Sequence, residues 1–292
     1  MTDLSQILSN FNTLKGVSCH TTRFQNREDG SNYDVWLIDA DGRRVVLKKA
    51  KGYELEIYER FLSIASVGVP EFIESTKHGD NKYFLTEYVE GNDLCVCDRA
   101  SLIKVLDALI ALQDRFWSDT SRLDVGHSLQ KSLDGRINRG KYLCDPRIEK
   151  AYELYLSLYQ HLPLTLCHDD LLPFNVIVNS SHAAIIDWEY AGMLPYPTSL
   201  VRLISHSEED GGAFFYIQNE DKAFAVEYYY ENLVRKKGIS RADYERDVHM
   251  FMLYEYCEWI YLGNKYKSDD KTMLEKYFQK AHSHLDAIGF EF

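Results

Sequence analysis

Two neighbouring stretches, residues 166–178 and residues 184–190, constrain the fold of this chain more than any others. They contain two short, mostly β-branched apolar runs, 176–178 and 184–186, and the turn-forming residues 179–181 lie between the runs. Short runs of this kind on either side of a turn predict the two strands of a small hairpin. A hairpin holds its strand ends together, so polar residues at those ends are brought to one place.

Polar side chains with metal-binding and catalytic potential lie at those strand ends. Asp170 and Asn175 precede the first strand, and Asp187 follows the second. Two carboxylates and an amide held together favour a bound divalent cation, which relieves the repulsion between the acids. The order His168-x-Asp170-x-x-x-x-Asn175 is also the arrangement of a phosphotransferase catalytic loop, and Asp187 stands where a second, metal-binding Asp is needed. A solvated turn with incidental acids is the alternative.

The residues around these positions resemble a known family. Residues 168–175 (His-Asp-Asp-Leu-Leu-Pro-Phe-Asn) resemble the His-Gly-Asp-Leu-His-Pro-Gly-Asn signature of the aminoglycoside phosphotransferase and choline kinase superfamily. Residues 187–192 (Asp-Trp-Glu-Tyr-Ala-Gly) resemble its metal-site motif in the form common among choline-kinase-like members. Asp169 replaces the usual Gly, Leu172 the second His and Phe174 the second Gly. None of these departures removes a catalytic group.

The resemblance implies an α+β, bilobal protein-kinase-like fold, with a β-rich N-lobe over residues 1–91 and a mainly helical C-lobe over residues 92–292. It implies ATP-dependent phosphorylation of a hydroxyl group on a small molecule, with GTP as a possible donor. Asp170 would orient the acceptor hydroxyl and accept its proton, and Asn175 and Asp187 would hold Mg²⁺. His168 would shape the loop by hydrogen bonding.

A nucleotide-binding flap is predicted near the N-terminus. Residues 30–32 (Gly-Ser-Asn) resemble the family turn that covers the phosphates, and Ser31 and Asn32 would offer backbone N–H groups to them. After a second glycine turn, the strand 44–49 carries Lys48, which would bridge the α- and β-phosphates. Lys49 is the rival, but strand alternation places it on the opposite face.

The Lys48 partner and the nucleotide hinge are predicted next in the chain. A helix over residues 52–66 offers Glu54, Glu56 and Glu59 as partners for Lys48, and the distance back from the turn at residues 68–70 favours Glu56. Residues 86–91 (Thr-Glu-Tyr-Val-Glu-Gly) resemble the hinge between lobes. There an adenine ring would bond the backbone C=O of Glu87 and the backbone N–H of Val89.

The acceptor site is expected in the C-lobe. Residues 251–262 have helical spacing, and Glu255, Glu258 and Trp259 would line a pocket for an amine or a quaternary ammonium group. An amphipathic core helix is the competing interpretation. Residues 118–146 are polar and contain three glycines, which predicts a surface insertion beside the cleft.

Composition narrows the ligand class. The formal net charge of −12 argues against nucleic acid as a partner and permits a cationic substrate. No apolar run reaches eighteen residues, the N-terminus does not have the pattern of a signal peptide, and the six cysteines form no C-x-x-C pair. We therefore expect a cytoplasmic chain without membrane insertion.

The acceptor itself stays open at this point. A choline- or ethanolamine-like acceptor is favoured, and an aminoglycoside is the alternative. A third hypothesis is a weakly active, nucleotide-binding pseudokinase, because Thr198 or Ser199 stands where the family has an Asp that tethers the catalytic loop. A protein kinase is disfavoured because no Ala-Pro-Glu-like segment follows Asp187. The oligomeric state is not predicted.

Overall fold

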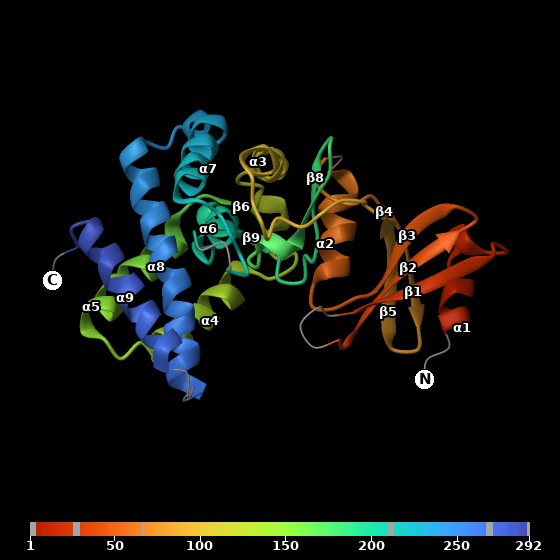
Figure 1. The fold of residues 1–292 in the computed structure, drawn as a ribbon, viewed down its shortest axis with the longest axis horizontal. Coiled ribbons are helices and arrows are strands. Elements are labelled where there is room, and N and C mark those ends of the chain that lie inside the picture. Colours follow the sequence, from red (N-terminus) through yellow and green to blue (C-terminus); the bar gives the residue numbers. More distant parts are fainter. Residues whose placement is uncertain (1–3, 26–29, 66, 210–212, 267–270, 291–292) are drawn as a thin grey trace.

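The chain folds into two lobes, as the sequence predicted (Figure 1). A computed structural model describes residues 4–25, 30–65, 67–209, 213–266 and 271–290. The first lobe is an antiparallel sheet with helices on both faces, and the second is mainly helical. The α+β, kinase-like fold class is therefore confirmed.

The N-lobe sheet has five antiparallel strands in the order β1-β2-β3-β5-β4. Alternation along β5 explains why the sheet is covered on both sides. Tyr83 and Leu85 pack with Ile7 and Phe11 in one core, while Phe84 packs against Tyr58 in the other core, with ring centroids 5.2 Å apart. The elements of this lobe are α1 (Leu4–Ser9), η1 (Asn12–Leu14), β1 (Cys19–Gln25), β2 (Asn32–Ala40), β3 (Arg43–Lys49), α2 (Glu54–Arg60), η2 (Leu62–Ile64), β4 (Phe72–His78) and β5 (Asn81–Glu87).

The connection between the lobes is fixed to the catalytic hairpin. Asn92 and Val178 exchange two backbone hydrogen bonds, with N···O distances of 2.9 and 2.7 Å. Gly91 allows this approach, because a Cβ atom there would lie 2.4 Å from the Val178 carbonyl oxygen. The segment that follows the last strand of the N-lobe therefore pairs with Val178, the last residue of β7.

The C-lobe surrounds two small two-stranded sheets with long helices. β6 pairs with β9, and β7 pairs with β8, so the hairpin predicted from residues 176–178 and 184–186 is confirmed. The side chains of Asp98, Ser128 and Asp145 cap the N-termini of helices α3, α4 and α5 by accepting hydrogen bonds from backbone N–H groups. The elements are α3 (Arg99–Arg115), η3 (Thr120–Arg122), α4 (Leu129–Gly140), α5 (Pro146–His161), β6 (Leu164–Cys167), η4 (Pro173–Asn175), β7 (Val176–Val178), β8 (Ala183–Ile185), β9 (Gly192–Pro195), α6 (Pro197–Ser205), α7 (Asn219–Asn232), η5 (Val234–Lys237), α8 (Arg241–Tyr266) and α9 (Lys271–Ala287).

One predicted helix is too long, and one segment contains a helix that was not predicted. The helix predicted over residues 52–66 ends at Arg60, and a short 3₁₀ turn follows it. The surface insertion predicted over residues 118–146 contains helix α4, which buries Ser132, Leu133 and Arg136. The sequence analysis predicted no helix in this segment, and the Ser128 cap and the tertiary contacts stabilise one there.

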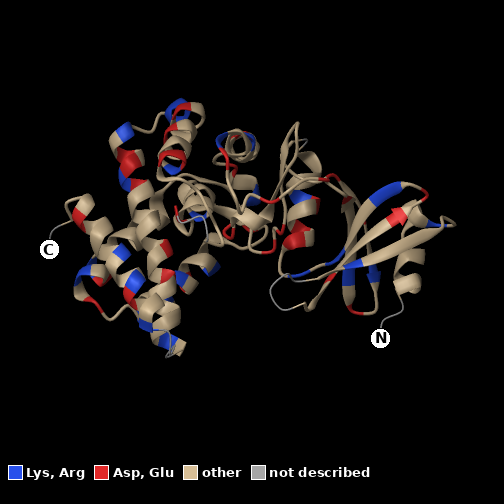
Figure 2. Ribbon diagram, viewed as in Figure 1, with Lys and Arg blue, Asp and Glu red and all other residues tan. Residues whose placement is uncertain are grey.

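Charged residues of both signs are distributed over both lobes (Figure 2). Within the part of the chain that the structure describes, no helix combines the length and the apolar character needed to cross a membrane.

Candidate active site

Lys48 lies at the centre of a buried ion-pair cluster between the lobes. Its ammonium group contacts the Glu54 carboxylate of α2 and lies 2.5 Å from Asp187 Oδ1 of the C-lobe. Burial disfavours the charge on Lys48, but Glu54 and Asp187 raise its pKa well above the ordinary value. Burial raises the pKa of Glu54 against the effect of Lys48. For Asp187 the burial effect is outweighed by Lys48, which lowers the pKa of that carboxyl.

The prediction that Glu56 pairs with Lys48 is wrong, because Glu54 makes that contact. Helix α2 begins at Glu54 and turns Glu54, Ile57 and Tyr58 inward, so Glu56 faces solvent. Glu56 instead accepts a hydrogen bond from the Gly126 N–H at 3.3 Å. The distance back from residue 68 was misleading because the helix ends one turn earlier than its sequence pattern suggested.

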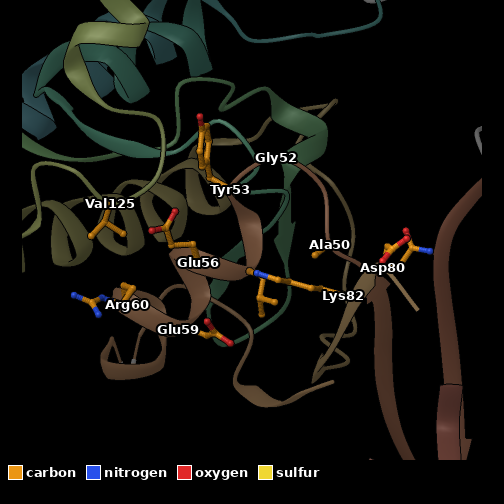
Figure 3. Close-up of a pocket in the computed structure, with 11 residues that line it drawn as sticks. Ala50, Gly52, Tyr53, Glu56, Glu59, Arg60, Asp80, Lys82 and Val125 are labelled. Atoms are coloured by element: carbon orange, nitrogen blue, oxygen red, sulfur yellow. The ribbon is translucent and has the colours of Figure 1, made fainter. Parts of the chain in front are cut away.

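An open groove of about 820 Å³ lies on the solvent side of α2 (Figure 3). The side chains of Tyr53, Glu56, Glu59 and Arg60 border it, together with Lys82 from β5. Neither Lys48 nor Asp187 lines this groove. It therefore lies outside the ion-pair cluster and is separated from it by the helix.

His168 is a buried structural group of the catalytic loop. Its Nε2 donates to the Ile186 carbonyl oxygen at 2.7 Å, and its ring packs on Trp188 with centroids 4.8 Å apart. Burial lowers the pKa of His168 to about 4, so the imidazole is neutral near pH 7. Its backbone N–H donates to Ser199 Oγ at 2.9 Å. A neutral hydroxyl thus occupies the place of the expected carboxylate, while Thr198 Oγ1 donates to the Pro195 carbonyl oxygen.

Hydrogen bonds link Asn175 to the backbone of Asp170 and to the backbone of Ile186, the residue before Asp187. The side-chain amide of Asn175 donates to the Asp170 carbonyl oxygen at 2.8 Å, so its Oδ1 is the atom that remains for a cation. The backbone N–H of Ile186 donates to the Asn175 carbonyl oxygen at 2.9 Å, which places Asp187 directly beyond this contact. Asp187 has a left-handed φ of 64°, and its side chain is 55% exposed.

Arg202 is a site residue that the sequence analysis missed. From helix α6 it contacts Asp170 Oδ1 with Nη2 at 2.8 Å and with Nε at 3.2 Å. Its Nη1 also contacts Glu255 at 2.7 Å and Glu258 at 2.9 Å. Burial raises the pKa of Asp170, and Arg202 opposes this effect. The sequence signal was the lone charged residue of this segment, three positions after Ser199.

The residues predicted for the acceptor pocket lie around Arg202. Glu255 is 4% exposed and pairs with Arg202 and with His206 at 2.9 Å. Burial raises the pKa of Glu255, but Arg202 outweighs this effect and lowers it to about 2. Glu258 also pairs with Arg139 at 3.1 Å, and Trp259 Nε1 donates to His206 Nδ1 at 3.1 Å. The carboxylates of Glu255 and Glu258 are thus connected to Asp170 through Arg202, but each of them is already paired with an arginine.

The predicted phosphate turn and hinge lie at strand ends of the N-lobe. Gly30 has a φ of 70°, and Asn32 begins β2 and accepts a hydrogen bond from Gln25 Nε2 at 3.3 Å. Ser31 precedes it, and residues 26–29 of this turn are outside the described residues. Glu87 ends β5 and donates its backbone N–H to the Glu71 carbonyl oxygen, and Val89 is buried.

This geometry agrees with a comparison against known protein families. Residues 24–230, well over half of the chain, match the phosphotransferase enzyme family. The chain belongs to this family. The superfamily resemblance read from the catalytic loop is therefore confirmed.

A curated protein matches part of this chain. A protein LicA homolog of Mycoplasma capricolum subsp. capricolum is 27% identical over 140 residues, which is 47% of this chain and 56% of the relative. The match thus spans little more than half of that relative.

Solved structures show the same fold. Aminoglycoside phosphotransferase APH(4)-Ia, in a ternary complex with ADP and hygromycin B, superposes with a TM-score of 0.62 at 14% identity over 100% of both chains. Choline kinase LicA from Streptococcus pneumoniae superposes with a TM-score of 0.58 at 12% identity, over 97% of this chain and 98% of that structure.

Proposed function

We propose that this phosphotransferase transfers the γ-phosphoryl group of ATP, with Mg²⁺, to the hydroxyl group of a small cationic molecule. In this proposal residues 1–91 form the nucleotide-binding lobe, and residues 92–292 carry the catalytic loop and the acceptor site. The observation that carries the proposal is the contact of Lys48 with both Glu54 and Asp187. This contact joins the two lobes at the point where the nucleotide phosphates would lie.

The donor atoms near Asp187 fit a magnesium ion. Mg²⁺ prefers oxygen ligands and is commonly held by one or two protein groups plus substrate phosphates. The Asn175 Oδ1 and the Asp187 carboxylate supply two such oxygens, and the lowered pKa keeps Asp187 ionised near neutral pH. When bound, the metal would neutralise charge on the β- and γ-phosphate oxygens.

The remaining roles are those that the family resemblance implies, with Glu54 in place of Glu56 as the partner of Lys48. Lys48 binds the α- and β-phosphates, and Glu54 holds it in place. Ser31 and Asn32 cover the phosphates, and the backbone of Glu87 and Val89 holds the adenine ring. Asp170 orients the acceptor hydroxyl and accepts its proton, and neutral His168 keeps the loop in shape.

A choline- or ethanolamine-like acceptor is the finer proposal. The motif of residues 187–192 and the LicA relatives support it. The carboxylates of Asp170, Glu255 and Glu258 outnumber the guanidinium groups of Arg202 and Arg139, which leaves one excess negative charge in this cluster before His206 is counted. A cation would therefore be attracted to the cluster as a whole rather than to one free carboxylate.

Two alternative functions are compared with this proposal. Aminoglycoside phosphorylation is supported by the fold shared with APH(4)-Ia. A weakly active pseudokinase was suggested by Ser199, but the Ser199 hydroxyl accepts the His168 N–H and so retains a loop contact. The intact contacts of Lys48 favour an active enzyme.

The test is a phosphate-transfer screen of amino alcohols and aminoglycosides, with ATP or GTP as donor and with and without Mg²⁺. We expect transfer to an amino alcohol that requires Mg²⁺. Asp170→Ala should lower kcat by roughly 10²- to 10⁴-fold with nearly unchanged ATP affinity. Full activity of Asp170→Asn, or transfer only to aminoglycosides, would contradict the assignment of the base or of the acceptor, respectively.

A further inference from the structure

Asp169, the residue between His168 and the catalytic Asp170, has an unusual backbone conformation. Its φ of 58° lies in the left-handed region, where a residue other than glycine is disfavoured. Asp tolerates this region better than most residues, but the conformation persists only when surrounding contacts hold it. The side chain of Asp169 is 12% exposed and points into the C-lobe rather than toward solvent.

The main contact of Asp169 is with Arg136 of helix α4, while Ser132 Oγ of the same helix donates to Asp169 Oδ2 at 3.4 Å and His127 Nδ1 lies 4.0 Å from Oδ2. Arg136 Nη2 lies 2.7 Å from Asp169 Oδ1, and the Arg136 side chain is 2% exposed. Its guanidinium lies between the rings of Tyr159 and Tyr254, at 4.4 and 4.5 Å from their centroids, and Nε donates to Tyr155 Oη at 2.8 Å. Three tyrosines therefore hold the Arg136 side chain in place, and Asp169 pairs with a fixed guanidinium group.

The other side-chain contacts of the loop are weaker or must change during the reaction. The His168 N–H is held by the neutral Ser199 hydroxyl, and a neutral acceptor gives a weaker bond than a carboxylate. The Asp170 carboxylate contacts Arg202, but it must also reach the acceptor hydroxyl in the proposed reaction. The Asp169–Arg136 pair is charged, nearly buried and not involved in either task.

We infer that Asp169 and Arg136 are positioning residues that fix the catalytic loop, and that their ion pair sets the direction of the Asp170 side chain. This inference rests on the proposed role of Asp170 as the base. The backbone is the physical link, because the φ of Asp169 determines the direction in which the chain enters Asp170. A small error in the position of a catalytic group costs up to about a hundredfold in rate.

The test compares variants that separate positioning from stability. Asp169→Asn keeps the shape and the left-handed tolerance but leaves the buried Arg136 guanidinium without its counter-ion. The double variant Asp169→Asn with Arg136→Met removes that unpaired charge as well. The matched control is Asp221→Asn, which breaks another pair of a buried Asp with an arginine, Arg99, between helices α7 and α3.

Three quantities are measured for each variant: Tm, the amide hydrogen-exchange rates of His168, Leu172 and Asn175, and kcat and KM for ATP. The N–H groups of Leu172 and Asn175 donate hydrogen bonds within the loop, and the N–H group of His168 donates to Ser199 of helix α6. For Asp169→Asn we expect a lower Tm, at least tenfold faster exchange at the three amides, at least tenfold lower kcat, and a KM within about twofold.

The double variant decides between positioning and simple destabilisation. We expect it to regain Tm relative to Asp169→Asn, because no buried charge is left unpaired, while the fast loop exchange and the low kcat persist. Asp221→Asn should lower Tm without changing loop exchange or kcat. Recovery of loop exchange and kcat together with Tm in the double variant would overturn the inference, as would unchanged loop exchange in Asp169→Asn.

The exchange measurement also separates this inference from the proposed function. If the unmodified protein transferred phosphate to no acceptor, the proposed function would fail. The exchange rates of Asp169→Asn and of the double variant would still show whether the ion pair holds the loop.

Discussion

The contrast between Glu54 and Glu56 gives the sharpest test of the nucleotide site. Both are glutamates of helix α2, two residues apart. Glu54 is 2% exposed and contacts Lys48, whereas Glu56 is exposed and contacts only the Gly126 backbone N–H among the described residues. We expect Glu54→Gln to impair phosphate transfer and Glu56→Gln to leave it nearly unchanged.

The magnitude follows from the type of hydrogen bond that is weakened. A glutamine would still accept a hydrogen bond from the charged Lys48 ammonium group, but the negative partner would be lost, and we expect this to remove about 1–2 kcal/mol of the about 1.5–3 kcal/mol that a hydrogen bond to a charged group contributes. This loss of about 1–2 kcal/mol corresponds to a fall in kcat/KM of roughly 5- to 30-fold. Lys48 keeps Asp187 as a partner, so the free energy of unfolding should fall by less than the ~3–5 kcal/mol typical of an orphaned buried charge.

The assay is steady-state phosphate transfer at varied ATP with saturating acceptor and Mg²⁺, with chemical denaturation to measure stability in parallel. Glu56→Gln is the matched control, because it makes the same chemical change on the same helix. Equal losses in the two variants, or a larger loss in Glu56→Gln, would refute the assignment of Glu54 as the Lys48 partner in catalysis.

Three further predictions concern the loop, the base and the hinge. Arg202→Met removes the cation that opposes the rise in the Asp170 pKa caused by burial, so this pKa should rise further. The acidic limb of the kcat/KM–pH profile should then move to higher pH. An acidic limb at the same pH as in the unmodified protein would contradict this prediction. His168 binds a proton less readily in the folded chain, where its pKa is about 4, than in the unfolded chain, where it is about 6.5. The free energy of unfolding should therefore fall by about 3 kcal/mol as the pH falls from about 6.5 to 4. In urea denaturation, the free energy of unfolding of His168→Gln should depend less on pH over this range. Gly91→Ala should destabilise the fold by ~1–3 kcal/mol, because the new Cβ would lie 2.4 Å from a carbonyl oxygen of β7. Gly135→Ala should stabilise the fold by ~0.5–1 kcal/mol, because Gly135 lies inside helix α4 and the new Cβ would be near only the end of an arginine side chain. Thermal denaturation measures both effects.

The local chemistry of the catalytic loop could be read from the sequence because its determinants are close together in the chain. His168, Asp170, Asn175 and Asp187 lie within twenty residues, and a hairpin of strands β7 and β8 is enough to bring them together. Alternation along β3 likewise places Lys48 and Lys49 on opposite faces of the sheet. The family and the two-lobed fold follow from these motifs.

The sequence pattern could not predict contacts between segments that are far apart in the chain. Three glutamates on one short helix could each have paired with Lys48, and only the end of α2 at Arg60 and its packing decide for Glu54. The acid-rich face of α8 suggested a free anionic pocket. Only the fold shows that Arg202, more than fifty residues earlier, pairs with Glu255.

The sequence by itself therefore determined the reaction class, because a few polar residues at short, fixed spacing suffice to define it. The tertiary structure decided how those residues are held and charged. Arg136 lies on a helix within the segment that the sequence presented as a surface insertion, and it reaches Asp169 only because α4 packs against the catalytic loop. Ion pairs and pKa values depend on burial and on partners far along the chain, and these appear only once the helices are packed.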